Sequence, residues 1–247
     1  MITIKTDAQI NLMRRAGKIV AETLEFVEKN LKPGMMTAEI DRIAEEFILS
    51  KGAKPAFKGY HGFPAATCIS IDDEVVHGIP GKRVLVEGQI VSVDLGAIFD
   101  GFYGDSARTF PIGEISEEKK KLLEVTKRSL EVGIAEVRAG NKLGRVSNAI
   151  QRSAESAGFS VVRDLVGHGI GRAMHEEPQI PNYGSANEGP VLASGMVLAI
   201  EPMVNIGTYK VQTKADGWTI VTIDGLPSAH FEHTVAVTNI DADILTI

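Results

Sequence analysis

The chain has 247 residues, of which 44% are hydrophobic and 23% are charged, and its formal net charge is -6 at pH 7. This length can bury a full core as one large or two small domains, and the composition is that of ordinary globular proteins. The negative charge and the lack of a dense Lys/Arg cluster exclude a nucleic-acid binder that tracks phosphates. Cys68 is the only cysteine, which excludes disulfides within one chain and thiolate metal sites.

No apolar run approaches the length of a membrane span, and the first residues lack the apolar core of a signal peptide. We therefore expect a cytoplasmic protein with no membrane partner.

Two helical patterns open the chain. Apolar residues recur at helical spacing over 7–30, where Thr6 and Gln9 predict a capping box. After the break LKPGM, a second helix is predicted over 37–51, ended by Gly52. The segments that follow are predicted as a loop over 55–64 and as short strands over 66–71 and 74–77.

A β-hairpin over 89–110 is the strongest local prediction. Two apolar, β-prone runs flank Asp100-Gly101, a pair typical of two-residue hairpin turns. Facing positions then sum to 201, so that Asp105 faces Gly96 and Asp94 lies two positions from Gly96. Side chains alternate with a period of two, which places both aspartates on one face as diagonal neighbours. Because buried carboxylates are costly unless a positive group holds them, the pair indicates a metal site. The alternative is two aspartates on a solvated edge.

The chain also repeats itself. Further helices are predicted from Ser116 to about Arg138 and over 144–157. A shift of 106 residues aligns the helix after LKPGM with the second of these, and a shift of 107 places Asp94 on Glu201. We therefore predict an α/β (α+β) fold of two pseudo-symmetric half-repeats, roughly 1–112 and 113–247. Their helices would pack on a shared, mainly antiparallel sheet within one domain, 1–247.

Further candidate ligands come from the second half. Glu201 interrupts the predicted strand GMVLAIEPMV, Glu232 lies in the predicted strand HFEHTVAVT, and His168 stands between glycines in GHGIGR. Together with Asp94 and Asp105 they make four carboxylates and one imidazole. Such a set suits two divalent ions held about 3.5–4 Å apart, and it suits Mn(II), Fe(II) or Co(II) at least as well as Zn(II). Taken singly, each acid is more simply a surface side chain.

Several segments resemble the type I methionine aminopeptidases, in the same order and over essentially the whole chain. They are EVVHGIP, VDLGAIFDGFYGDSARTF, GHGIGRAMHEEP, AIEPMVN and FEHTVAV. The resemblance implies the fold called pita-bread, a peptidase that removes the initiator methionine when the second residue is small, and two divalent metal ions (Co, Mn, Fe(II) or Zn). The implied metal ligands are the same five residues: Asp94, Asp105, His168, Glu201 and Glu232.

Catalytic and substrate-binding roles are also implied by this resemblance. His77 would contact the nitrogen of the scissile bond, although by itself it is more simply a loop histidine beside a turn. His175 would stabilise the oxyanion, and Glu201 would act as general base while also binding metal. The residues that match the family's methionine pocket are Tyr60, Phe63, Cys68, Met174 and Trp218, with Phe57 and His61 nearby. Composition alone would assign most of these to the core.

The chain departs from the family at three positions. Many members have cysteine, histidine and phenylalanine where this chain has Phe57, Tyr103 and Met174. None of the three is an implied ligand, so they leave open only the shape and tolerance of the pocket.

The resemblance implies a monomer that acts on the N-terminal methionine of nascent polypeptides, in reach of the ribosome exit region and without nucleic-acid specificity. Two alternatives remain. An X-Pro aminopeptidase or prolidase shares the fold but typically carries a further N-terminal domain, for which we expect no room in this chain. A metal-free pita-bread protein that only binds its partner would have lost ligands, and here all five are present.

Overall fold

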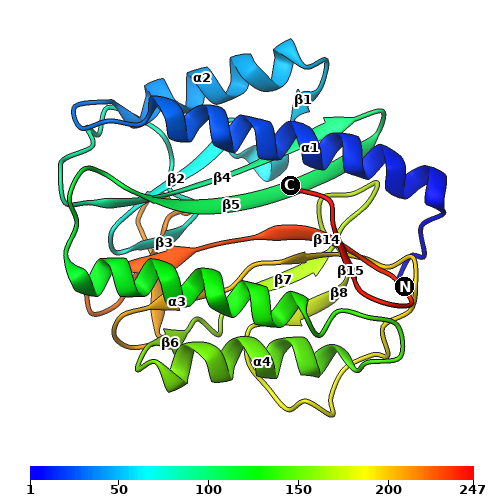
Figure 1. Cartoon of the computed structure of the whole chain (residues 1–247). Helices are drawn as coiled ribbons and strands as arrows, with labels where there is room; N and C mark the ends of the chain where they lie inside the picture. Colours follow the sequence, from blue (N-terminus) through cyan, green and yellow to red (C-terminus); the bar gives the residue numbers. More distant parts are fainter.

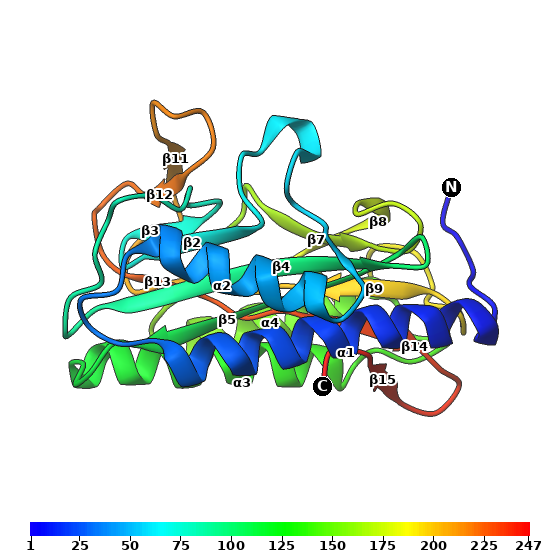
Figure 2. The same ribbon diagram turned by 90° about the horizontal axis from the view of Figure 1, so that it is seen from above.

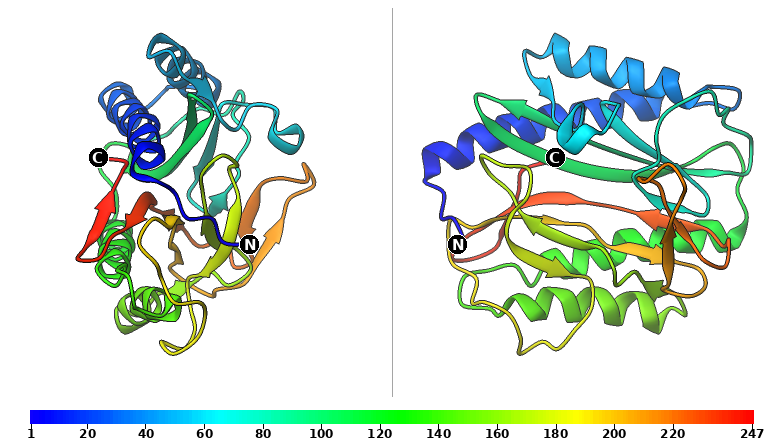
Figure 3. Two further views of the ribbon diagram at one scale, coloured as in Figure 1. Left: turned by 90° about the vertical axis from the view of Figure 1, so that its right-hand side faces the viewer. Right: turned by 180° about the vertical axis from the view of Figure 1, so that it is seen from behind.

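The computed structural model describes residues 1–247, and its four α-helices lie on one face of a layer of strands (Figure 3). The helices are α1 (Asp7–Asn30), α2 (Thr37–Ser50), α3 (Glu117–Ile134) and α4 (Leu143–Ser156). Figure 1 shows α1 and α2 over the upper half of this layer and α3 and α4 over the lower half. No helix combines the length and apolar character needed to cross a membrane.

The strands pair only in antiparallel fashion, as the predicted fold class requires. The first half contains β1 (Lys54–Pro55), the 3₁₀ turn η1 (Tyr60–Gly62), β2 (Thr67–Ile71), β3 (Glu74–Val76), β4 (Ile90–Phe99) and β5 (Phe102–Pro111). The second half contains β6 (Ser160–Val161), β7 (Val166–Gly169), β8 (Glu176–Pro181), β9 (Val197–Ile200), β10 (Met203–Asn205), β11 (Val211–Thr213), β12 (Ile220–Thr222), β13 (Ser228–His230), β14 (His233–Val237) and β15 (Ala242–Ile244).

The strands form two larger and two smaller hydrogen-bonded groups. The larger groups are β1-β4-β2, with β5 on β4, and β15-β14-β9-β7-β8. The smaller groups are β13-β10-β6 and β11-β12-β3. Because β3 belongs to the first half and β11 and β12 to the second, one of the smaller groups joins the two halves directly.

The central hairpin has the predicted register. Gly96 pairs with Asp105 and Asp94 pairs with Ala107, so the two aspartates lie diagonally on one face. The turn residues Asp100 and Gly101 have φ of 48° and 78°. Positive φ at both central positions is the hairpin turn that Asp-Gly favours, because its twist matches that of the strands.

The predicted repeat is visible in matched turns. Gly34 and Gly140, which the sequence alignment pairs, have φ of 88° and 91°, a region that favours glycine. Gly34 donates its N–H to the carbonyl of Leu85 at 2.8 Å, and Gly140 donates to that of Leu192 at 2.9 Å. Each turn therefore leads into the second helix of its half with the same hydrogen bond. Each half also has its own apolar core between its helix pair and its strands.

The halves meet where β5 runs beside β14 (Figure 1). The Thr234 hydroxyl donates to the carbonyl of Asp105 at 2.8 Å and accepts from its N–H at 3.0 Å. Ser106 donates its hydroxyl to the carbonyl of Glu232 at 2.5 Å, and the N–H of Glu232 donates to the carbonyl of Ala107 at 2.9 Å. The shared sheet is thus joined largely by hydroxyl side chains instead of a continuous backbone ladder.

Some predicted boundaries are wrong. The third helix ends at Ile134 instead of Arg138, because Glu136 and Val137 donate to carbonyls three residues back and tighten the chain into turns. The predicted strand GMVLAIEPMV is divided into β9 and β10 at Glu201-Pro202, since proline has no N–H to donate. Glu232 lies in the gap between β13 and β14, not inside a strand, and the predicted loop over 55–64 contains η1.

Candidate metal centre and adjoining cavity

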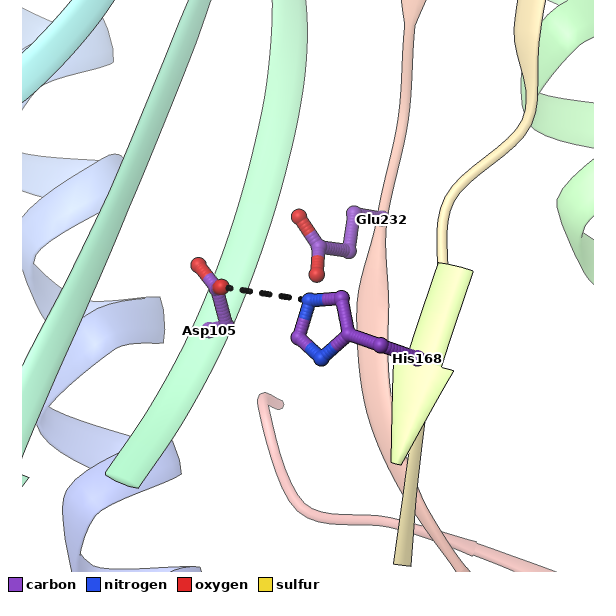
Figure 4. Close-up of side chains that lie close together, drawn as sticks. All are labelled: Asp105, His168 and Glu232. Atoms are coloured by element: carbon purple, nitrogen blue, oxygen red, sulfur yellow. Dashed lines mark ion pairs between the residues drawn. The ribbon is translucent and has the colours of Figure 1, made fainter. Parts of the chain in front are cut away.

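The five predicted metal ligands come together from different elements of both halves. Asp94 lies on β4, Asp105 on β5 and His168 on β7, whereas Glu201 and Glu232 lie where strands break. All five line one cavity of about 220 Å³. Figure 4 shows Asp105, His168 and Glu232 pointing toward one another, with ligand atoms within 4.8 Å.

His168 is presented as a neutral ligand. Its Nδ1 lies 2.9 Å from the carbonyl oxygen of Gly169, to which Nδ1–H donates. Its Nε2 therefore carries the lone pair, 3.5 Å from Oε1 of Glu201 and 4.0 Å from Oδ2 of Asp105. Burial, and then the nearby His175, lower the pKa of His168 to about 4, which keeps the imidazole uncharged at neutral pH.

No positively charged protein group balances the charge of the four carboxylates. Burial raises the pKa of Asp105 to about 7. Burial first, and then the neighbouring carboxylates, also raise the pKa values of Asp94, Glu201 and Glu232. Oxygens of Asp94, Asp105 and Glu232 are buried without a hydrogen-bond partner, and no lysine or arginine lines the cavity. Buried carboxylates require a positive counter-charge, and oxygen ligands suit divalent metal ions. This set of carboxylates therefore fits a divalent metal site.

The two predicted catalytic histidines, His77 and His175, line the same cavity. His175 contacts His168 edge to face, with ring centroids 4.3 Å apart, and its Nδ1 lies 2.7 Å from the hydroxyl of Tyr60. Burial raises the pKa of Tyr60, so the phenol keeps its proton and can donate it to Nδ1. In the tautomer with Nδ1 as acceptor, the other nitrogen of His175, Nε2, carries the N–H. His77 has a positive φ of 59°, uncommon for a residue with a side chain, and stands directly after β3.

The rest of the lining is mainly apolar. Phe63 and Trp218 pack edge to face with ring centroids 5.2 Å apart. Cys68 enters the cavity wall because it pairs with Asp94 across β2 and β4. Met174 is buried beside the histidines. A volume of about 220 Å³ is below the roughly 300–1,000 Å³ of drug-sized pockets, which suits one amino-acid side chain.

The cavity lining coincides with the predicted site. The fourteen residues around it are Phe57, Tyr60, His61, Phe63, Cys68, His77, Asp94, Asp105, His168, Met174, His175, Glu201, Trp218 and Glu232. All the predicted ligands, catalytic residues and pocket residues are among them, and so are the two residues named as lying nearby. The structure therefore brings the set together, and the role of each member stays a prediction.

The sequence profile of metallopeptidase family M24 matches residues 11–239. The chain belongs to this family. It is 55% identical to methionine aminopeptidase 1 of Bacillus subtilis, over 100% of this chain and 99% of that protein. The crystal structure of methionine aminopeptidase from Thermotoga maritima superposes with a TM-score of 0.98 at 51% identity, over 100% of this chain and 99% of that one. The pita-bread fold expected from the sequence is thereby confirmed.

More distant solved structures share the fold alone. The prolidase from Pyrococcus horikoshii has a TM-score of 0.81 at 22% identity, and the match covers 99% of this chain but 63% of the prolidase. At this identity the similarity carries no argument about substrate.

One buried residue beside the predicted metal ligands was not predicted from the sequence. His230 ends β13 with 1% of its surface exposed, and its Nε2 lies 3.7 Å from Oε2 of Glu201. Burial, and then nearby His77, lower its pKa to about 3. The signal was available, since His230 stands two residues before Glu232 in a β-prone segment and period-two alternation favours a common face.

Proposed function

We propose that this chain is a metal-dependent aminopeptidase that removes an N-terminal methionine when the second residue is small. The carrying observation is that four buried carboxylates, the neutral His168 and a set of apolar side chains line one small cavity. The names of the relatives point to the same activity. Because both halves contribute to this one cavity, we treat residues 1–247 as one catalytic domain.

In this proposal two divalent ions are held by Asp94, Asp105, His168, Glu201 and Glu232. When bound, they would polarise the peptide carbonyl and acidify a water molecule. The carboxylate-rich donor set suits Mn(II), Fe(II) or Co(II) at least as well as Zn(II).

The remaining steps belong to the side chains. The methionine side chain would enter between Phe63, Trp218 and Met174, where only apolar surface is offered. Glu201 would accept a proton from the attacking water while it also binds metal. His175, with Nδ1 occupied by the Tyr60 hydroxyl, would donate Nε2–H to the developing oxyanion.

His77 would contact the scissile nitrogen and position the leaving group. The Thr219 hydroxyl, which donates to Oδ2 of Asp216 at 2.7 Å, lies 3.5 Å from the backbone carbonyl oxygen of His77.

The test is hydrolysis of Met-Ala-Ser, Met-Lys-Ser and Ala-Pro-Ser after reconstitution with Mn(II), Fe(II) or Co(II), with Asp94→Ala as control. We expect methionine release from Met-Ala-Ser alone, lost in the control. Cleavage confined to Ala-Pro-Ser would reassign the chain to X-Pro peptidases. Absence of both turnover and metal uptake would instead favour a protein that only binds its partner.

The proposal extends to a monomeric cytoplasmic enzyme acting on nascent chains near the ribosome exit region. These points rest on the resemblance. Light scattering and co-sedimentation with ribosomes carrying nascent chains test them, and a stable dimer or no ribosome-dependent sedimentation would contradict them.

A further inference from the structure

Glu201 lies between two imidazoles, one facing each of its carboxylate oxygens. Its Oε1 is 3.5 Å from Nε2 of His168, and its Oε2 is 3.7 Å from Nε2 of His230. His168 is one of the five predicted ligands, whereas His230 has no part in that set. The second imidazole therefore needs its own explanation.

The ring of His230 is fully enclosed, and neither of its nitrogens has a hydrogen-bond partner. A neutral imidazole carries one N–H donor, and leaving a buried donor unpaired costs about 1–3 kcal/mol. The residue's backbone is fixed on both sides by Thr109, whose hydroxyl accepts from its N–H at 2.9 Å and donates to its carbonyl at 2.8 Å. The ring is thus anchored beside Glu201, and a movement of under about 1 Å would bring Nε2 into hydrogen-bond range.

We propose that His230 is a positioning residue that carries its proton on Nε2 and donates it to Oε2 of Glu201. This bond holds one carboxylate oxygen, so that Oε1 stays turned toward His168 and the metal ligands. The inference rests on the proposed function only in that it gives Glu201 a role as ligand and base.

The expected benefit follows from geometry. A carboxylate that must both bind a metal and take a proton works only in one orientation, and a displacement of about 1 Å costs up to 100-fold in rate. Groups that hydrogen-bond to metal ligands typically contribute about 10–100-fold in affinity or activity. A ring that only filled space would contribute packing but would not orient the carboxylate of Glu201.

The first experiment observes the proton directly. We would label the histidines of the metal-free protein with ¹⁵N, record two-bond proton–nitrogen correlations, and assign His230 from the signals that disappear in His230→Gln. The inference requires the Nε2–H tautomer. An Nδ1–H tautomer, or an even mixture of the two, would overturn it, whether or not the protein binds metal or cleaves peptides.

The second experiment separates the orienting effect of the His230 hydrogen bond from the packing of its ring. Mn(II) affinity by calorimetry and kcat/KM on Met-Ala-Ser are compared for wild type, His230→Leu and His230→Gln. We expect His230→Leu to lose about 10–100-fold in Mn(II) affinity. His230→Gln retains an N–H donor and should stay within about threefold of wild type, a difference of under 1 kcal/mol.

The matched control is His233→Gln, since the ring of His233 instead contacts the Thr246 hydroxyl at 2.8 Å. It should bind Mn(II) like wild type. A wild-type affinity in His230→Leu, or an equal loss in His230→Leu and His230→Gln, would refute the positioning role. If His230→Leu fails to fold, the tautomer and the His230→Gln affinity still decide. Mn(II) binding by wild type without methionine release would contradict the proposed function alone.

Discussion

The ammonium group of Lys5 lies 2.8 Å from the carboxylate of Glu176, and their side chains are only 3% and 14% exposed. The other oxygen of Glu176 accepts the backbone N–H groups of Arg172 and Ala173 at 2.9 and 3.2 Å. Glu176 thereby closes the loop that carries His175, and Lys5 anchors this loop to the start of the chain. Lys5 is itself held through its N–H, which donates to the carbonyl of Gly195 at 2.7 Å.

We predict that Lys5→Met destabilises the protein and slows methionine release. Breaking a buried ion pair costs about 3–5 kcal/mol, and we expect about 2–3 kcal/mol here because Glu176 keeps two N–H donors. Urea unfolding and kcat/KM on Met-Ala-Ser measure both effects. The exposed cation of Lys29, replaced by methionine, is the control, and the idea fails if Lys5→Met unfolds at the wild-type urea concentration.

The metal-free protein should lose stability as the pH rises above about 7. The pKa of Asp105 is raised to about 7 and those of Asp94, Glu201 and Glu232 are also raised, so the folded state retains protons that the unfolded state releases. The stability due to these protons is present at low pH and is lost as the pH rises through the folded-state values. Buried His168, with its pKa lowered to about 4, acts in the opposite sense, but only below its ordinary value of 6.5.

We therefore expect the metal-free protein to melt at a lower temperature at pH 8 than at pH 6.5. Each 1 kcal/mol lost from the free energy of unfolding lowers the melting temperature by about 2–4 °C. Mn(II) should stabilise the protein more at pH 8, because ligands must be deprotonated to bind. Asp105→Asn should weaken the pH dependence. Scanning calorimetry in chelated and Mn(II)-loaded samples measures it, and a melting temperature that rises between these pH values without metal contradicts the assignment.

The sequence predicted the hairpin and the position of Asp94 and Asp105 on one face because both depend on local rules. The Asp100-Gly101 turn and the period-two alternation determine the register of Asp94 against Asp105, and nothing distant has to be known. The repeat extended this inference to Glu201, since a matched strand places a matched side chain. The resemblance then brought in the residues from the turns and loops around the cavity.

The missed features depend on contacts that are distant in sequence. Lys5 and Glu176 are 171 residues apart, and no periodicity links them. The break between β13 and β14 follows from hydroxyl groups of the neighbouring strand, such as Thr109, that take over backbone hydrogen bonds. The alternation of His230 with Glu232 could be read from the sequence, but its place beside Glu201 depends on the pairing of β13 with β10.

The hydrogen bond from Tyr60 to His175 should matter for turnover more than for stability. Tyr60→Phe keeps the ring and removes only the hydroxyl group that is hydrogen-bonded to Nδ1 of His175. A net hydrogen bond is worth about 0.5–1.5 kcal/mol, so we expect a roughly 2- to 12-fold fall in kcat with little change in melting temperature. Steady-state kinetics on Met-Ala-Ser measures it. Tyr209→Phe, at an exposed tyrosine outside the cavity, is the matched control. An unchanged kcat in Tyr60→Phe would remove this bond from the mechanism.

A contact between α1 and β5 supports the predicted metal centre from behind. Figure 2 shows α1 running along β5, and Gly104 precedes the predicted ligand Asp105. A Cβ on Gly104 would lie 2.7 Å from the backbone nitrogen of Gly17 and 2.9 Å from the carbonyl carbon of Ala16. Both obstacles are backbone, so neither can turn away as a side chain would. The absence of a side chain at Gly104 is what allows the helix to approach the strand.

Gly104→Ala should therefore force the helix and the strand apart and displace Asp105. Overpacking of this kind costs about 1–3 kcal/mol, and we expect a melting temperature lower by several degrees together with weaker Mn(II) binding. Gly81→Ala is the control, since a Cβ there has no heavy atom within 4 Å. Thermal unfolding and calorimetry test both expectations. If Gly104→Ala melts and binds Mn(II) like Gly81→Ala, the close approach of α1 does not hold the ligand strand in place.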